Sequence, residues 1–126
     1  MPVKSFRDLE VYQEAVDLAI EIDKLLKTFP KDERFLLVDQ MKRASRGIAP
    51  LISEGYAKRE SVKEFRKFLR DAIAESNEML THLELSGRLG YLKNENWAAK
   101  LIEGYDTLGK KLSNLKTNWQ NYPSNL

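Results

Sequence analysis

Residues 61–90 read SVKEFRKFLRDAIAESNEMLTHLELSGRLG, and this stretch gives the strongest indication of the fold. Its apolar residues recur at three- and four-residue spacing along most of its length, as one face of an α-helix requires. Ser61 and Glu64 have the spacing of a capping box, and Gly90 is a typical carboxyl-terminal cap. The stretch therefore predicts a long amphipathic helix over residues 61–89.

Three further segments show the same apolar periodicity, over about residues 8–28, 32–55 and 94–119. Asp32 is a plausible start, and Gly55 a plausible stop, for the segment over residues 32–55. Pro50 lies inside it and predicts a bend, because proline removes a backbone donor. Short connections between long helices favour antiparallel neighbours. We therefore expect an all-α fold, an antiparallel up-down-up-down four-helix bundle, as a single domain over residues 1–120 with a tail over 121–126.

Composition excludes several classes of protein. The 126 residues contain no cysteine, which excludes disulfides and thiolate metal sites. The first residues lack the apolar core of a signal peptide, and no apolar run reaches the roughly 18 residues that a membrane span needs. We expect a cytoplasmic protein without membrane association.

Charge is concentrated between Gln40 and Arg70. This segment has nine basic and three acidic residues, a net charge of +6, whereas the other twelve bases and sixteen acids give −4. The nine bases are Lys42, Arg43, Arg46, Lys58, Arg59, Lys63, Arg66, Lys67 and Arg70. Such a segment on a helical scaffold predicts a surface that binds a polyanion, since each neutralised phosphate releases counterions.

The last four of these bases fall at i, i+3, i+4 and i+7 of the predicted third helix and form one stripe. We expect Arg43 and Arg46, on the second helix, to lie toward the same end and to merge with that stripe. Tyr56 is the one nearby candidate for stacking on a base. The alternative that these bases only solvate an exposed helix face stays open.

Catalytic motifs are scarce. His82 is the single histidine and follows Glu78 by four residues, whereas a di-iron bundle needs a Glu-x-x-His motif on each of two helices. Neither a Gly-x-Ser-x-Gly elbow nor a phosphate-binding loop is present. We expect no enzymatic activity, no cofactor and no metal site, with His82 at the edge of the core or in solvent.

Some large apolar residues lie off the main apolar stripes: Leu36, Leu37, Leu51, Trp119 and Tyr122. Patches of this kind often mark contacts between subunits. Packing at the ends of the bundle is the alternative, and the pattern alone does not decide between them.

Several short motifs occur in order along nearly the whole chain: Phe6-Arg7-Asp8-Leu9-Glu10-Val11-Tyr12, Phe29-Pro30, Gln40-Met41-Lys42-Arg43-Ala44, Ser53-Glu54-Gly55-Tyr56, Glu64-Phe65 and Leu89-Gly90-Tyr91-Leu92. In this order they resemble the small four-helix-bundle proteins encoded in intervening sequences of bacterial 23S rRNA genes. The resemblance implies an antiparallel bundle assembled as a ring-shaped homopentamer. The chain departs from the family pattern at Ile48-Ala49-Pro50-Leu51 and at Ala74-Glu75, where Ile-Pro-Ala-Asn and Gly-Ser are usual.

A related branch of this family comprises accessory proteins of diversity-generating retroelements. These bind nucleic acid and a reverse transcriptase through a basic surface, which the resemblance would place here at Arg43, Arg46, Lys63 and Arg66. The leading hypothesis is a non-enzymatic oligomeric bundle that binds RNA or DNA through its basic surface with little sequence specificity. The alternatives are an accessory protein of a reverse transcriptase and a structural oligomer with no role on nucleic acid.

Overall fold

The computed structural model describes residues 3–119 and contains, over that range, four long α-helices and no strand. The long helices are α1 (Glu10–Leu26), α2 (Leu37–Ala57), α3 (Val62–Arg88) and α4 (Glu95–Asn118), and the short 3₁₀ helices are η1 (Phe6–Asp8) and η2 (Lys31–Glu33). The predicted all-α class with four helices is therefore confirmed.

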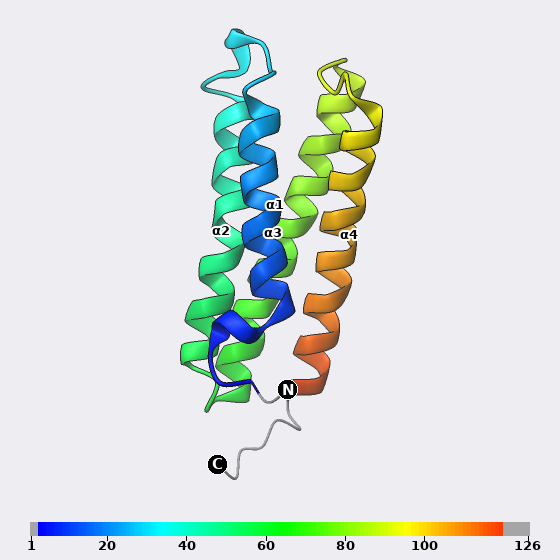
Figure 1. The fold of residues 1–126 in the computed structure, drawn as a ribbon. Helices are drawn as coiled ribbons and strands as arrows, with labels where there is room; N and C mark the ends of the chain where they lie inside the picture. Colours follow the sequence, from blue (N-terminus) through cyan, green and yellow to red (C-terminus); the bar gives the residue numbers. More distant parts are fainter. Residues whose placement is uncertain (1–2, 120–126) are drawn as a thin grey trace.

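The helices run antiparallel in chain order around one core (Figure 1). α1 and α3 each pack against α2 and α4, and within the described residues neither α1 and α3 nor α2 and α4 come as close. The α1–α2 and α3–α4 connections lie at one end of the bundle. The α2–α3 connection lies at the other end, with the start of α1 and the end of α4 (Figure 1). We call this second end the α2–α3 end.

Each helix contributes fully buried side chains to the core: Ile22 from α1, Met41, Ile48 and Ile52 from α2, Phe65, Leu69, Met79 and Leu83 from α3, and Tyr105, Leu108 and Leu112 from α4. Two glycines allow neighbouring helices to approach closely. A Cβ at Gly55 would lie 2.6 Å from the Cβ of Phe68, and one at Gly104 would lie 2.7 Å from a methyl of Leu18. Gly55 is thus a packing residue inside α2 and not its stop.

The second helix begins at Leu37 and not near Asp32. Asp32 lies in η2, and the Glu33 carboxylate, 3.4 Å from the Leu37 N–H, is the group that faces the start of α2. Residues 34–36 therefore lie outside the helix, where Phe35 is 78% exposed instead of lying on the core face. Pro50 lies within α2, and the helix continues through it to Ala57 without a break.

Two predicted helix caps are present, at Ser61 and Gly90, and Asn94 caps the start of α4. Ser61 Oγ accepts a hydrogen bond from the Glu64 N–H at 3.2 Å, and Gly90 adopts a φ of +82° after α3. Asn94 Oδ1 accepts a hydrogen bond from the Trp97 N–H at 3.0 Å. These local signals set the ends of α3 and the start of α4, as the sequence predicts.

The off-stripe apolar residues divide between core and surface. Leu37 and Trp119 are buried at the bundle ends and Leu51 is half-buried, whereas Leu36 is exposed. Tyr122 lies outside the described residues. Over residues 3–119, no helix combines the length and apolar character needed to cross a membrane.

Candidate functional site

The nine basic residues of the charged segment occupy three separate places in the bundle. Lys42, Arg43 and Arg46 lie in the first half of α2, and Lys58 and Arg59 follow α2 in the connection to α3. The remaining four lie in the first turns of α3: Lys63, Arg66, Lys67 and Arg70. Only these last four line one groove together, as the following contacts show.

A groove runs between α3 and α4 at the α2–α3 end. It is lined from α3 by Val62, Lys63, Glu64, Arg66, Lys67 and Arg70, and from α4 by Lys116 and Thr117. We call it the basic groove. Five of its eight lining residues are basic and one, Glu64, is acidic, so the surface carries a strong positive charge. The amino end of α3 also points its positive dipole end toward this region.

Arg66 closes the contact between the two helices of the basic groove. Its Nε donates to the carbonyl oxygen of Lys116 at 3.0 Å, and its Nη2 donates to the carbonyl oxygen of Thr117 at 3.4 Å. The last carbonyls of a helix have no partner within the helix, and they carry the negative end of its dipole. Arg66 is therefore bound to the end of α4 as well as lining the groove.

The other α3 bases of the groove point into solvent. Lys63 and Lys67 are exposed, and within residues 3–119 neither makes an ion pair. Arg70 is also exposed, and its Nε lies 3.9 Å from a carboxylate oxygen of Asp71, a contact too long and too exposed to neutralise it strongly. These three side chains are available to an anion.

The bases on α2 face a different part of the surface. Arg46 Nη2 donates to Asp23 Oδ1 of α1 at 2.8 Å, and Arg43 Nε lies 3.2 Å from Asp39 Oδ2. Gly55, which packs on Phe68 of α3, is nine residues beyond Arg46, a rise of about 14 Å along the helix. The predicted merger of the α2 bases with the α3 stripe is therefore wrong. It fails because Arg46 turns toward α1, whereas Arg66 turns toward α4.

Lys58 and Arg59 pack on aromatic rings at the end of α2. Lys58 Nζ lies 5.0 Å from the ring centroid of Phe68, and Arg59 Cζ lies 4.2 Å from that of Tyr56. Arg59 Nη1 also donates to the Tyr56 carbonyl oxygen at 3.1 Å. Both positions suit a cation, because the carboxyl end of a helix is negative. These two residues have a structural role at the helix end.

Tyr56 does not offer a ring for base stacking. It is only 5% exposed and packs edge-on against Phe65 and Trp119, with ring centroids 6.4 and 6.2 Å away. The suggestion that it stacks on a base is wrong. Its ring belongs to the core because Trp119 closes the bundle over it.

Lys116 is the one base of the basic groove that lies outside the charged segment. It belongs to the last turn of α4, which antiparallel packing places beside the first turns of α3. The sequence contains that signal, since the end of the fourth helix must meet the start of the third in such a bundle. The charge of one continuous segment does not reveal Lys116, because this residue lies outside that segment.

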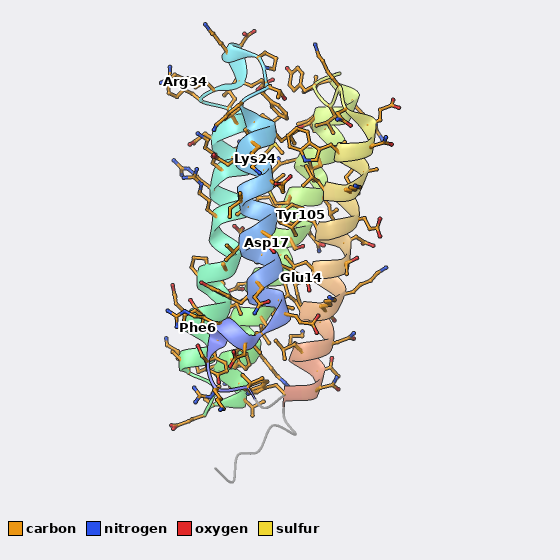
Figure 2. All side chains as sticks on the ribbon, viewed as in Figure 1. Phe6, Glu14, Asp17, Lys24, Arg34 and Tyr105 are labelled. Atoms are coloured by element: carbon orange, nitrogen blue, oxygen red, sulfur yellow. The ribbon has the colours of Figure 1, made fainter. Side chains whose placement is uncertain are left out.

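The groove between α1 and α4 has the opposite charge. Glu14, Asp17 and Glu21 of α1 and Glu103 of α4 line it with Lys100 as its one base, and Glu14 and Asp17 project from α1 beside α4 (Figure 2). Lys111 Nζ contacts Glu14 at 2.6 Å and Glu10 at 3.1 Å, and these hydrogen bonds raise the pKa of Lys111. Acidic and basic side chains are thus separated onto different faces that share α4.

Comparison with known families gives a match along most of the chain. Residues 7–114 match the family described as 23S rRNA-intervening sequence protein. The chain belongs to this family. The match spans α1, α2, α3 and most of α4, and it includes every basic-groove residue except Lys116 and Thr117. No curated protein matches the chain.

Two titratable side chains of α3, His82 and Glu75, lie close to other charged groups. His82 Nε2 lies 3.1 Å from Glu78 Oε2, with its side chain 13% exposed, at the edge of the core. Partial burial, together with the neighbouring charges of Glu78 and Asp71, raises the pKa of Glu75. Within residues 3–119 no three histidine, aspartate or glutamate side chains are placed to hold a metal ion.

Proposed function

We propose that this 23S rRNA-intervening sequence protein binds nucleic acid through the basic groove and catalyses no reaction. One observation carries the proposal: Lys63, Lys67 and Arg70 of α3 and Lys116 of α4 line a single groove with Glu64 as its one acid. Phosphates that replace condensed counterions at such a surface give affinity that does not depend on sequence. A related branch of the resembled family, the accessory proteins of diversity-generating retroelements, binds nucleic acid, and this supports the same function.

The groove favours binding to the backbone and not to base edges. Its side chains end mainly in ammonium and guanidinium groups, which recognise phosphate oxygens by charge and hydrogen bonding. Reading of base edges needs an element that enters a nucleic-acid groove, and the basic groove is a recess between two helices. Little sequence specificity is expected.

A non-catalytic role agrees with the chemistry of the described side chains. His82 is the one histidine of the chain, and its recorded side-chain partner is Glu78. The chain has no thiol. A cysteine nucleophile is therefore excluded within this chain.

The test is an anisotropy titration of a labelled RNA hairpin with the parent, Lys63→Gln/Lys67→Gln and the control Lys31→Gln/Lys93→Gln. Lys31 and Lys93 are exposed in the connections at the opposite end of the bundle, so the control removes equal charge. Loss of two phosphate contacts at 0.1 M salt weakens binding by a factor on the order of 50. The control should bind like the parent, and equal losses in the two variants would contradict the proposal.

A third variant, Lys42→Gln/Arg43→Gln, measures the contribution of the α2 bases. Because they lie on another part of the surface, we expect a smaller loss than for Lys63→Gln/Lys67→Gln. A parent protein that binds no hairpin at any salt concentration would overturn the proposal. It would leave a reverse transcriptase partner and a purely structural oligomer as the remaining candidates.

We also propose that the chain assembles with copies of itself. Apolar side chains are exposed at the end of the bundle that carries the α1–α2 and α3–α4 connections: Phe35, Leu36, Leu85 and Leu89. Contiguous exposed apolar surface often marks a subunit contact. The family resemblance implies a homopentameric ring, and light scattering after gel filtration measures the mass. A monomer at all concentrations would contradict assembly.

A further inference from the structure

The basic groove lacks a feature that proteins specific for single strands use. Such proteins combine a positive channel with exposed aromatic rings on which successive bases stack, worth about 1–3 kcal/mol per base. At the α2–α3 end, Tyr56, Phe65 and Trp119 are all buried. Phe68 is half-buried, and Lys58 covers its ring.

The exposed aromatic side chain of residues 3–119 is Phe35, and it lies at the opposite end of the bundle. Its ring is contacted by the guanidinium of Arg34 at 5.0 Å. A strand held in the basic groove therefore meets cations but no described ring. The favourable term that offsets the ordering of a flexible single strand is missing.

The bases of the groove are held in a fixed spacing. Lys63, Lys67 and Arg70 lie on one rigid helix, and the first and last are separated by a rise of about 10 Å. A double helix carries one phosphate per strand for every 3.4 Å or so of its axis, so a regular row of phosphates runs past a set of bases of this length. Lys116 adds a fourth charge from the facing helix, and Arg66 fixes the relation of the two helices.

We propose that the basic groove takes the phosphate backbone of a double helix in preference to a single strand. This inference rests on the proposed function and specifies its substrate. A duplex presents its phosphates in a regular array before binding, so bases spaced along one helix meet them without ordering the ligand. A single strand must first be ordered, and residues 3–119 offer no stacking platform at the groove that would stabilise it in that state.

The test compares four ligands of equal length: a duplex RNA and a duplex DNA of 20 base pairs, and oligo-U and oligo-dT of 20 nucleotides. Fluorescence anisotropy gives Kd for each between 50 and 200 mM salt. We expect both duplexes to bind at least tenfold more tightly than either single strand. Comparison of the Kd for duplex RNA with the Kd for duplex DNA then shows which of the two double helices the groove prefers.

The salt dependence links that preference to this site. For the duplexes, Lys63→Gln/Lys67→Gln removes two of the four available bases, so the slope of log K against log salt should fall to about half. The control Lys31→Gln/Lys93→Gln should keep the parent slope.

Three results would contradict the inference. Equal or tighter binding of a single strand would contradict the duplex preference while leaving the proposed function in place. Absence of binding to all four ligands would overturn both the duplex preference and the proposed function. A duplex preference with an unchanged slope in Lys63→Gln/Lys67→Gln would place duplex binding elsewhere on the chain and contradict the role of the groove.

Discussion

The guanidinium of Arg66 is bonded to the backbone of α4, with its Nε 3.0 Å from the carbonyl oxygen of Lys116. These residues are fifty positions apart in the chain, yet both line the basic groove. A residue that sequence reasoning assigns to binding is therefore also part of the helix packing. Its replacement will change stability as well as charge.

Arg66→Gln should lower the free energy of unfolding by about 1–3 kcal/mol, because carbonyl groups at the end of α4 lose a charged donor. Urea denaturation followed by circular dichroism measures the change. Lys67→Gln is the matched control, since Lys67 is exposed and should change stability by less than about 0.5 kcal/mol. Equal stability of Arg66→Gln and the parent would show that the contact with α4 does not stabilise the bundle.

Gly55→Ala should destabilise the bundle by about 1–3 kcal/mol, since the added methyl would lie 2.6 Å from the Cβ of Phe68 and 3.0 Å from the ring of Phe65. Gly109→Ala is the control. A Cβ there meets only Ser76 Oγ at 3.7 Å, and alanine favours the helix by up to about 1 kcal/mol. Thermal unfolding should give opposite shifts for the two variants, and a stabilised Gly55→Ala would contradict the close approach of α2 and α3.

Tyr105→Phe should leave stability unchanged or raise it by up to about 1 kcal/mol. The Tyr105 hydroxyl is fully buried and has no hydrogen-bond partner among the described residues, and burial raises its pKa strongly. Removing a buried hydroxyl that has no partner relieves a desolvation cost. Ser76→Ala, which removes a 2.9 Å hydrogen bond from Ser76 Oγ to the Tyr105 carbonyl oxygen, should instead destabilise. A large loss in Tyr105→Phe would reveal a partner for the hydroxyl.

Glu75→Gln should stabilise the protein at pH 7, and the gain should disappear near pH 4. Partial burial and the charges of Glu78 and Asp71 raise the pKa of Glu75 in the folded state above its ordinary value of 4.5, against a smaller opposing effect of His82. The folded state then holds the proton more tightly, so stability declines as pH rises from 4.5 through the folded pKa. Above that range the ionised carboxylate is a constant cost, which glutamine removes.

The measurement for Glu75 is the urea midpoint at pH 7 and at pH 4, compared with Glu60→Gln at an exposed position of the α2–α3 connection. The urea midpoint of the Glu60→Gln variant should equal that of the parent at both pH values. A Glu75→Gln midpoint that differs from the parent by the same amount at pH 7 and pH 4 would exclude a titrating carboxylate as the cause.

The helices could be predicted because their information is local. Apolar periodicity gives α3, and the side chains of Ser61 and Asn94 mark starts that the structure confirms. The start of α2 could not be predicted in this way, because Glu33, and not the more typical Asp32, faces the Leu37 N–H. A cap of that kind depends on the path of the chain after Pro30.

The site was predictable only in part. The stripe from Lys63 to Arg70 follows from helical spacing, and the structure keeps it together. The neighbouring helix that this stripe faces depends on how each helix is rotated about its axis. Charge patterns in the sequence do not specify that rotation. Arg46 therefore turns to Asp23, and Lys116 joins from a distant part of the chain.

The separation of acids between α1 and α4 from bases between α3 and α4 gives the molecule a permanent dipole moment across its width. In the field of a polyanion such a molecule is turned before contact, with the carboxylates held away and the cations leading. Orientation of this kind raises the fraction of productive encounters, and added salt suppresses it. A chain with a net charge of only +2 would in this way present a cationic face first to the phosphate backbone that the proposed function requires.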